Sequence, residues 1–262
     1  MLEKKNKHER DDNIVFEEYG HKYTYNGDCN MGDKDDMGDK KDFKSVTTVV
    51  HEFFEKFDAD KIIDKMMESS KWPNSKYYGM TKEEIKQLWS ENGKNASKLG
   101  TQMHAEIEDY FNERLDVKEK TKEYKQFEEF WKEFKNVNPT WEPFRTEWIV
   151  YDEKKKLAGS IDFLLSDSDG NIVIIDWKRS KEIKMANKFK KGTGPFKSLD
   201  DCNYNHYTIQ LNCYRHIIET KYNKKVAAMY IVVCHPNNDC AQIITINRRE
   251  DIIEDLWKHL PL

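Results

Sequence analysis

The chain has 262 residues, of which 35% are charged and 13% are aromatic, and its formal net charge is -4. This length can bury a sizeable hydrophobic core, and the aromatic content supplies material for one, so an intrinsically disordered chain is excluded. The negative charge excludes a protein that coats nucleic acid nonspecifically, because such binding needs many phosphate-neutralising side chains. We expect any contact with nucleic acid to be local.

Apolar segments and cysteines indicate the compartment. The longest apolar stretches, such as residues 226–234, are far shorter than the roughly 20 residues of a transmembrane helix. The opening residues MLEKK lack the apolar core of a signal peptide. The cysteines contain no C-x-x-C pair, which is typical of reduced thiols. We therefore expect a soluble intracellular protein without membrane contacts and without a zinc or iron–sulfur site.

The N-terminal residues predict a hairpin and a polar loop. Residues 14–26 include an alternating segment followed by a turn at Gly27, which predicts a short hairpin or edge strand. Residues 31–42 contain the hexapeptide MGDKDD followed by MGDKKD. The acidic residues of this repeat lack EF-hand spacing, so we predict a duplicated polar loop rather than a calcium site.

Helices are predicted from residue 45 onward. Apolar residues at helical spacing indicate two helices with buried faces, and Asp58 can cap the second. The residues of these faces are Val49, Val50, Phe53, Phe54 and Phe57, then Ile62, Ile63, Met66 and Met67. Thr81 and Glu84 have the pattern of a capping box that opens a third helix, and we expect a longer helix after Gly93, over about residues 96–115.

An aromatic stripe marks the next helix. It consists of Tyr124, Phe127, Phe130, Trp131 and Phe134. Helical spacing favours a buried face over a base-stacking surface, because a core-facing stripe has this period.

The pattern then changes to strands, over residues 144–151, 157–165 and 171–178, with a hairpin turn at DSDGN (167–171). This order predicts an antiparallel meander. A helix (204–222), two strands (226–235 and 241–246) and a final helix (250–260) are expected to follow. The elements predict an α/β fold with a central mixed sheet of about five strands flanked by helices, and an N-terminal helical elaboration. We expect a single domain, with the elaboration in residues 1–95 and the core in residues 96–262.

Two charged residues near the end of the third strand point to chemistry. Asp176 and Lys178 are two apart in a strand, so they share a face, and hairpin pairing can place Asp162 beside Asp176. Adjacent carboxylates repel each other and lose hydration, so a fold keeps them near its core mainly when a cation neutralises both. Oxygen ligands with room for water suit one or two Mg²⁺ or Mn²⁺ ions. Lys178 would then orient a water molecule or stabilise developing negative charge.

A histidine is the next candidate. His104 precedes Glu108 by four residues in a predicted helix, which puts both on one face. Most single histidines on helices satisfy buried hydrogen bonds, so this pair alone leaves a structural and a functional interpretation open.

Four motifs taken together resemble a known family: GTQMHAEIE (100–108), GSID (159–162), IDWK (175–178) and QLNCY (210–214). Their order resembles the RecB-like exonuclease branch of the PD-(D/E)XK nuclease superfamily over about residues 99–214. The resemblance implies a restriction-endonuclease-like core. It looks closest to RecB-type exonuclease domains and to the mitochondrial genome-maintenance exonuclease.

The resemblance also implies roles for single residues. His104, Asp162 and Asp176 would bind the metal together with the backbone carbonyl of Trp177, and Lys178 would complete the catalytic set. Four further residues would support the site or contact nucleic acid: Glu108, Glu147, Gln210 and Tyr214. The clustered cysteines that hold an iron–sulfur cluster in some relatives are missing, so we expect no such cluster.

A basic segment follows the predicted catalytic strand. Residues 178–191 contain seven Lys or Arg and a single Glu. A solvated loop is the alternative for any such charge run. Its position favours binding of the phosphate backbone, and the candidates are Lys181, Lys184, Lys188 and Lys190.

The sequence therefore predicts a Mg²⁺- or Mn²⁺-dependent DNA exonuclease that hydrolyses phosphodiester bonds from single-stranded or duplex ends through a metal-activated water. The resemblance implies a role in DNA repair, recombination or replication. Residues 45–79 also resemble stand-alone nucleases of large DNA viruses, which leaves open a viral origin and action in a host cell. The alternatives are an RNA or structure-specific DNA endonuclease, a non-catalytic nucleic-acid-binding relative, and a purely structural ion-pair network. Polarity, strand preference, oligomeric state, protein partners and pathway are left open.

Overall fold

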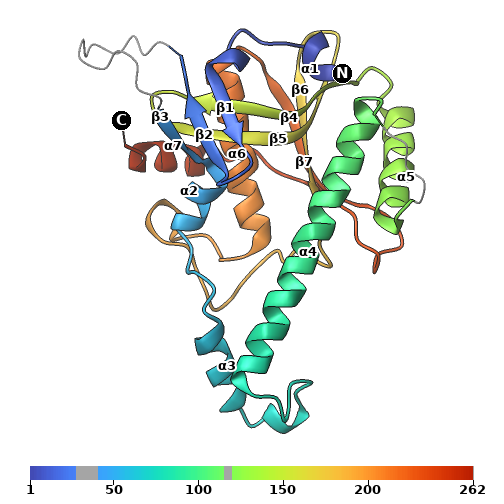
Figure 1. Ribbon diagram of the computed structural model, residues 1–262. Coiled ribbons are helices and arrows are strands. Elements are labelled where there is room, and N and C mark those ends of the chain that lie inside the picture. The colour runs from blue at the N-terminus through green and yellow to red at the C-terminus, as the bar shows by residue number, and fades with distance from the viewer. Residues whose placement is uncertain (28–40, 115–119, 262) are drawn as a thin grey trace.

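Residues 1–27, 41–114 and 120–261 are described by a computed structural model, in which helices cover both faces of an eight-stranded mixed sheet (Figure 1). The strands are β1 (Ile14–Glu17), β2 (Lys22–Tyr25), β3 (Lys41–Ser45), β4 (Glu142–Asp152), β5 (Leu157–Ser166), β6 (Ile172–Lys178), β7 (Val226–Val233) and β8 (Gln242–Thr245). The predicted α/β class and mixed sheet are confirmed. The expected strand number of about five is too low, because the N-terminal strands join the same sheet.

The helices follow the predicted order with two exceptions: α1 was not predicted, and the two helices predicted on either side of Gly93 are a single helix. They are α1 (Leu2–Lys5), α2 (Val46–Glu52), α3 (Ala59–Met67), α4 (Lys82–Phe111), α5 (Lys122–Val137), α6 (Asn203–Lys221) and α7 (Glu250–His259). Short 3₁₀ turns occur at Asp11–Asn13, Trp72–Asn74 and Gly194–Phe196. No helix among the described residues is both long and apolar enough to span a membrane.

The predicted meander is confirmed. Strand β5 pairs antiparallel with both β4 and β6. In the turn after β5, Asp167 Oδ1 accepts hydrogen bonds from the backbone N–H groups of Asp169 (3.0 Å) and Asn171 (2.8 Å), which closes the hairpin. Helix α6 then carries the chain to β7, which pairs parallel with β6 and antiparallel with β8.

Strand β5 has an interruption on one edge. Its partner β4 pairs along the whole strand, so β3 and β6 must share the other edge. On that edge β3 pairs with residues 157–158 and β6 pairs with residues 163–166. Residues 159–162 therefore have no strand partner there, and the sheet splits at the GSID motif.

The two faces of the sheet carry separate cores. Ile172 and Ile174 of β6 belong to the core that contains the buried residues of α2, α6 and α7. Val173, Ile175 and Trp177 alternate with them and pack with the aromatic stripe of α5 and the C-terminal part of α4. The aromatic stripe is thus a core element, as its spacing predicted.

The N-terminal hairpin is confirmed, with β1 and β2 paired antiparallel. Most of the hexapeptide repeat, residues 31–40, lies outside the described residues. The chain continues in β3, which the sequence did not predict because KDFKS contains a single apolar residue, Phe43. Pairing with β2 and β5 makes this polar segment a strand.

The prediction of two helices separated at Gly93 is wrong. Helix α4 runs unbroken from Lys82 to Phe111 and so crosses residue 95, where the elaboration and core were divided. Thr81 and Glu84 form the predicted capping box at its start. A glycine inside a helix costs about 1 kcal/mol relative to alanine, which the rest of a 30-residue helix can offset.

Helix α3 and the N-terminal half of α4 form an arm that projects from the sheet (Figure 1). Ile63 and Ile85 are fully buried in it, and Lys82 Nζ lies 2.7 Å from Asp64 Oδ1. Asp58 caps α3 as predicted, since its Oδ1 accepts a hydrogen bond from the Lys61 N–H at 3.0 Å. Two residues predicted to be buried are exposed. Phe57 (70%) lies outside both helices, because α2 ends at Glu52 and α3 begins at Ala59. Ile62 (36%) is exposed because two helices alone cover only one side of α3.

Candidate active site

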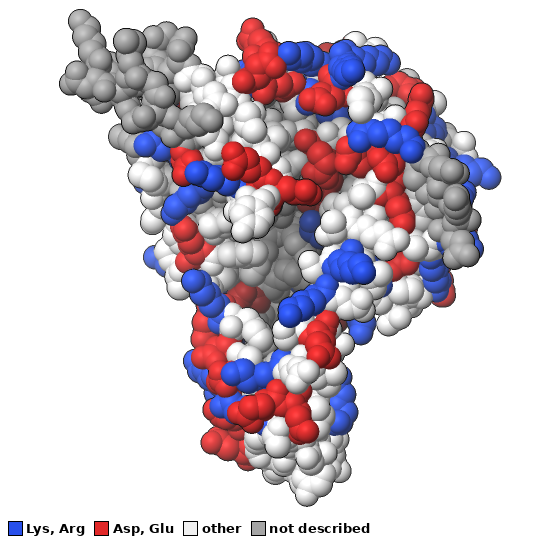
Figure 2. Space-filling model, viewed as in Figure 1, with Lys and Arg blue, Asp and Glu red and all other residues white. Residues whose placement is uncertain are grey.

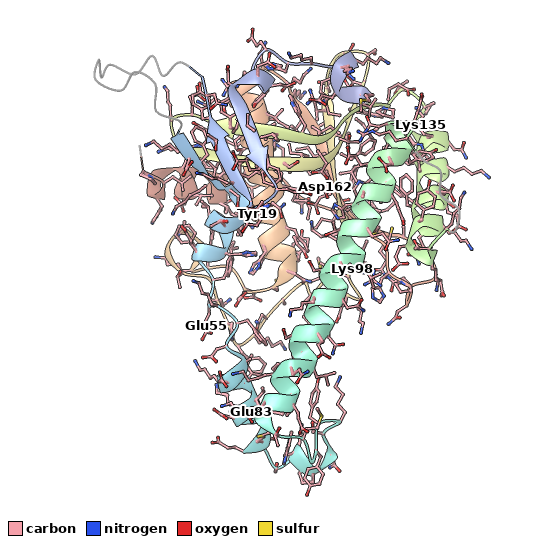
Figure 3. All side chains as sticks on the ribbon, in the orientation of Figure 1. Tyr19, Glu55, Glu83, Lys98, Lys135 and Asp162 are labelled. Atoms are coloured by element: carbon pink, nitrogen blue, oxygen red, sulfur yellow. The ribbon has the colours of Figure 1, made fainter. Side chains whose placement is uncertain are left out.

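Three candidate ligands meet where β5 is unpaired. Potential ligand atoms of His104, Glu147 and Asp162 all lie within 4.8 Å of one another. His104 Nδ1 of α4 is 3.5 Å from Asp162 Oδ2 of β5. Figure 3 shows Asp162 between the β1–β2 hairpin and α4, with Tyr19 at the end of the hairpin.

Glu147 reaches this cluster through an unusual backbone conformation. It lies in the middle of β4 with φ +44°, between the pairs Thr146↔Phe163 and Trp148↔Ile161, and so opposite Asp162. The left-handed region is unfavourable for a residue with a long side chain, and such strain is concentrated at functional sites. Ser160 Oγ donates a hydrogen bond to Glu147 Oε2 at 2.7 Å, which fixes the carboxylate.

Electrostatics at Glu147 disfavour its charged form. Loss of hydration is the first cause and the negative charge of Asp162 the second, and together they raise the pKa of Glu147 to about 8. The Glu147 side chain still has exposed surface, so we give more weight to repulsion between the carboxylates than to exclusion of water. A cation beside this cluster would relieve that repulsion.

Asp176 and Lys178 form an ion pair at the end of β6. Lys178 Nζ lies 2.5 Å from Asp176 Oδ2, but this buried oxygen accepts no hydrogen bond of favourable geometry from the described residues. Burial raises the pKa of Asp176 to about 6. Burial opposes the Lys178 ammonium, yet the charges of Asp176 and Asp162 raise its pKa. We conclude that both groups are ionised near neutral pH.

Asp162 also contacts β6 directly. Its Oδ2 accepts a hydrogen bond from the Trp177 backbone N–H at 2.9 Å. A side chain thus takes the place of the strand pairing that ends at residue 163. The role of the Trp177 carbonyl as a metal ligand stays a prediction.

Helix α6 supports the site from one face. Tyr207, Gln210 and Tyr214 follow helical spacing, and Gln210 Nε2 donates to Tyr214 Oη at 3.3 Å. The Lys178 ammonium lies 5.0 Å from the centre of the Tyr207 ring, within cation–π range. Sequence analysis missed Tyr207, although its spacing from Gln210 and Tyr214 was a signal.

Gly159 is required by the packing of α6. A Cβ atom at this position would lie 2.6 Å from Tyr214 Cε1, closer than side chains approach each other. The glycine of the GSID motif therefore lets a buried tyrosine pack directly against β5, next to Asp162.

A contact from the N-terminal hairpin was also missed. Tyr23 Oη of β2 accepts a hydrogen bond from the Ser160 backbone N–H at 3.1 Å, on the unpaired part of β5. The two residues are 137 positions apart, and no local pattern links them.

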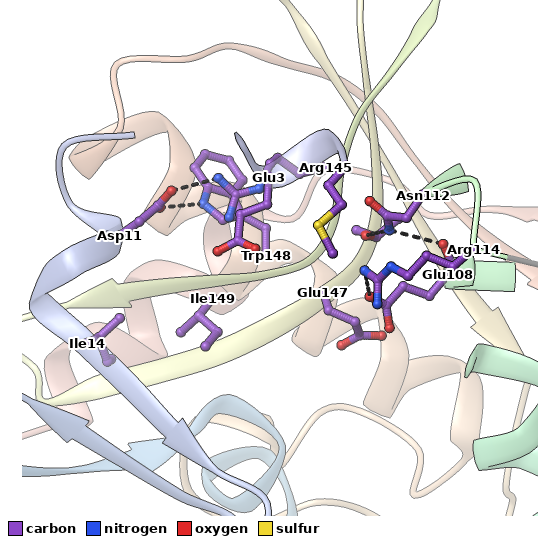
Figure 4. Close-up of a pocket in the computed structure, with 12 residues that line it drawn as sticks. Glu3, Asp11, Ile14, Glu108, Asn112, Arg114, Arg145, Glu147, Trp148 and Ile149 are labelled. Atoms are coloured by element: carbon purple, nitrogen blue, oxygen red, sulfur yellow. Dashed lines mark hydrogen bonds and ion pairs between the residues drawn. The ribbon is translucent and has the colours of Figure 1, made fainter. Parts of the chain in front are cut away.

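The site opens into a cavity of about 690 Å³ bordered by the hairpin, α4, β4 and β5. His104 and Glu108 both line it, which confirms that they share a face of α4. A smaller pocket of about 200 Å³ adjoins it (Figure 4). Glu108 and Glu147 line both spaces, and Arg114 Nη2 lies 3.1 Å from Glu108 Oε1.

The donor set fits a divalent cation. One imidazole nitrogen and two carboxylates converge within 4.8 Å. Asp176 adds a buried carboxylate oxygen that accepts no hydrogen bond from the described residues. Nitrogen and oxygen donors of this kind suit a divalent cation. The close cluster contains His104 and Asp162, which were predicted as ligands, and Glu147, which was predicted as a supporting residue. Ligand roles for Asp176 and the Trp177 carbonyl stay predictions.

The predicted basic residues lie on the connection between β6 and α6. Lys181, Lys184 and Lys188 are exposed and form no ion pair within the described part of the chain. Lys190 pairs with Glu55 at 2.9 Å. Figure 2 shows the side of the molecule seen in Figure 1. Acidic side chains lie across its upper middle, and basic side chains lie beside the hollow below them.

Comparison with known proteins gives a family match over most of the chain. The model of the PD-(D/E)XK nuclease superfamily matches residues 22–260. No curated protein matches. Among solved structures, the chain resembles a Eubacterium rectale protein titled "Putative exonuclease", at 18% identity and a TM-score of 0.39 over 62% of this chain and 63% of that one. It also resembles SSO0001, at 14% identity and a TM-score of 0.33 over 82% and 71%. Structural likeness at this level carries no conclusion about activity.

Proposed function

Because the chain belongs to the PD-(D/E)XK nuclease superfamily, we propose that it is a divalent-metal-dependent DNA exonuclease of the RecB-like branch. The observation that carries the proposal is the convergence of His104, Glu147 and Asp162 within 4.8 Å at the split in the sheet. Nucleases of this superfamily generally use divalent metals, and these donors fit one.

In this proposal His104, Glu147 and Asp162 hold the ion, with Asp176 beside them. Bound Mg²⁺ or Mn²⁺ supplies Lewis acidity for the scissile phosphate and lowers the pKa of a water molecule. The chain holds the ligands in place beforehand: Trp177 N–H fixes Asp162, and Ser160 Oγ fixes Glu147. Such fixed ligands reduce the reorganisation needed at the moment of reaction.

Lys178 is the proposed electrostatic catalyst. Its ammonium is held between Asp176 (2.5 Å) and the Tyr207 ring (5.0 Å), and the surrounding carboxylates keep it protonated. A positive charge fixed in place stabilises negative charge that develops on phosphate oxygens.

The choice of a DNA exonuclease is supported by the order and spacing of the four motifs, which resemble RecB-like exonucleases. Action at free ends would suit a role in DNA repair, recombination or replication. We also retain the single-domain assignment over residues 1–262 as part of this proposal.

The test is digestion of end-labelled linear DNA and of circular DNA by the purified protein, with Mg²⁺ or Mn²⁺ and with EDTA. We expect the linear substrate to lose nucleotides from its ends with either metal and to stay intact in EDTA. Circular single-stranded DNA should resist digestion. Its cleavage would identify an endonuclease, preferential cleavage of RNA would identify a ribonuclease, and metal-independent cutting would contradict the proposed site.

A further inference from the structure

The connection between β6 and α6 presents an exposed phenylalanine between two lysines. Phe189 has 95% of its surface exposed, and Lys188 and Lys190 flank it in the chain. Isolated exposed apolar residues are common and need no explanation by themselves. Phe189 differs from such residues because it lies in a turn that hydrogen bonds hold in place.

The turn is held by backbone and side-chain hydrogen bonds that do not involve the Phe189 ring. Asn187 Oδ1 accepts hydrogen bonds from the backbone N–H groups of Phe189 (3.1 Å) and Lys190 (3.3 Å). The Asn187 N–H donates to Asp200 Oδ2 at 2.9 Å, and its Nδ2 donates to the Asp201 carbonyl at 2.8 Å. The turn is therefore already ordered. A ligand that binds the exposed ring would lose little further backbone conformational entropy on binding.

The segment around the ring carries a net positive charge, because residues 181–201 contain six lysines against three carboxylates. Two of the nearby carboxylates are paired with lysines, since Asp200 Oδ1 lies 2.5 Å from Lys191 Nζ and Glu55 Oε2 lies 2.9 Å from Lys190 Nζ. Lys184 and Lys188 have no ion-pair partner among the residues that the structure describes. On a chain with a net charge of -4, such a local positive surface favours an anionic partner.

The turn is connected to the candidate active site through the start of α6. Asn203 Oδ1 accepts a hydrogen bond from the Lys184 N–H at 2.7 Å. One turn further along α6, the Tyr207 ring lies beside the Lys178 ammonium. In Figure 1 the connection runs below the sheet, between α2 and α4.

Resting on the proposed nuclease function, we propose that Phe189 stacks on a base of a single-stranded nucleic acid while Lys184 and Lys188 contact its phosphates. An aromatic ring beside cations is the usual chemistry of single-strand binding, because every base has a π face. In a duplex the base faces are covered by their neighbours, so a projecting ring cannot reach them. Lys190 is paired with Glu55, so it joins the turn to the connection between α2 and α3. The substrate thus reaches the site as a single strand.

The test measures binding separately from cleavage. Fluorescence anisotropy in EDTA gives the Kd of the full chain for a labelled oligothymidine, for an abasic strand of the same length and for a blunt duplex. We expect Phe189→Ala to weaken binding of the oligothymidine about tenfold, and to change Kd for the abasic strand and the duplex less than twofold. Phe189→Trp, which keeps a stacking surface, should bind like the wild type.

Phe57→Ala is the matched control, because Phe57 is also an exposed aromatic (70%) but lies at the start of the arm and packs on Trp89. It should leave all three Kd values unchanged. Equal weakening for the base-containing and abasic strands would overturn the stacking role, as would a dimeric wild type that Phe189→Ala makes monomeric. If the wild type digests DNA but Phe189→Ala has no effect on binding, the inference fails while the proposed function stands. If the wild type neither binds nor cleaves nucleic acid, both fail.

Discussion

Side chains replace strand pairing along residues 159–162 of β5, where the sheet splits. Tyr23 Oη accepts the Ser160 N–H, and the Asp162 carboxylate accepts the Trp177 N–H. The Tyr214 ring covers Gly159. Buried backbone groups need such partners, so the segment that carries a catalytic candidate is held by residues from three other elements.

The charges of Asp176 and Lys178 have separable roles. Asp176→Ala removes a candidate ligand, so we expect loss of turnover and clearly weaker binding of Mn²⁺. Lys178→Ala should also abolish turnover but keep metal affinity, because it removes a cation that competes for Asp176. Isothermal titration calorimetry with Mn²⁺, alongside the nuclease assay, distinguishes the two. Equal loss of metal binding in both variants would contradict these roles.

Glu147 makes stability depend on pH. Its pKa is raised to about 8 in the folded protein, against about 4.5 when unfolded. The folded state therefore binds more protons between these values, and metal-free protein loses stability as the pH rises from about 4.5 to about 8. We expect Glu147→Gln to raise Tm relative to wild type at pH 8 in EDTA, and to give little or no rise at pH 5.

The matched experiment adds Mn²⁺ at pH 8. The wild type should gain Tm and Glu147→Gln should gain less, because the metal relieves repulsion that the amide has already removed. A Tm difference between the proteins that does not change with pH would show that Glu147 titrates normally.

Gly159→Ala tests the contact between α6 and β5. The added methyl would lie 2.6 Å from Tyr214 Cε1, so one of the two elements must shift. Overpacking of this kind costs about 1–3 kcal/mol. We expect urea denaturation to show a loss of this size, and nuclease activity to fall because Asp162 lies three residues away. An unchanged free energy of unfolding would show that α6 can shift away from β5 without an energetic cost.

At the scale of elements, α4 connects the arm to the site. Its capping box lies in the arm, and His104 and Glu108 lie near its other end. Because the helix is continuous, it joins the arm directly to the candidate ligand His104.

Gly93→Ala tests this continuity. Nothing lies within 4 Å of a Cβ at this position, and its φ is not positive. Alanine in the middle of a continuous helix should stabilise it by about 1 kcal/mol. We expect slower hydrogen exchange over residues 82–98 and a small rise in Tm, opposite in sign to Gly159→Ala. A helix that ended at Gly93, as the sequence suggested, would gain nothing.

At the scale of the whole molecule, an acidic chain must bind a polyanion through a small positive surface. Each phosphate contact to a single strand contributes about 0.7 to the slope of log K against log salt. We expect Lys184→Ala and Lys188→Ala each to lower this slope by about that amount for oligothymidine. Lys61→Ala removes a lysine of α3 that pairs with Glu55, and it should leave the slope unchanged. Equal effects of all three changes would place the binding surface elsewhere.

The sequence by itself determined the helices and strands of the core, their order and the candidate residues. Periodicity, capping boxes and turns act between neighbouring residues, so they can be identified without the fold. It predicted the hairpin turn after β5 and the shared face of His104 and Glu108 for the same reason. The sequence-based prediction was wrong at Gly93, because a long helix tolerates one glycine. It was also wrong at Phe57, because few residues are available there to cover the ring.

Only the tertiary structure decided how these parts meet. The N-terminal strands joined the sheet, β5 lost a partner at residues 159–162, and Glu147 joined His104 and Asp162 through a strained backbone. Each of these depends on contacts between segments far apart in the chain, such as the 137 positions that separate Tyr23 from Ser160. Local preferences carry no information about such contacts, because packing of the whole sheet determines which distant segments pair.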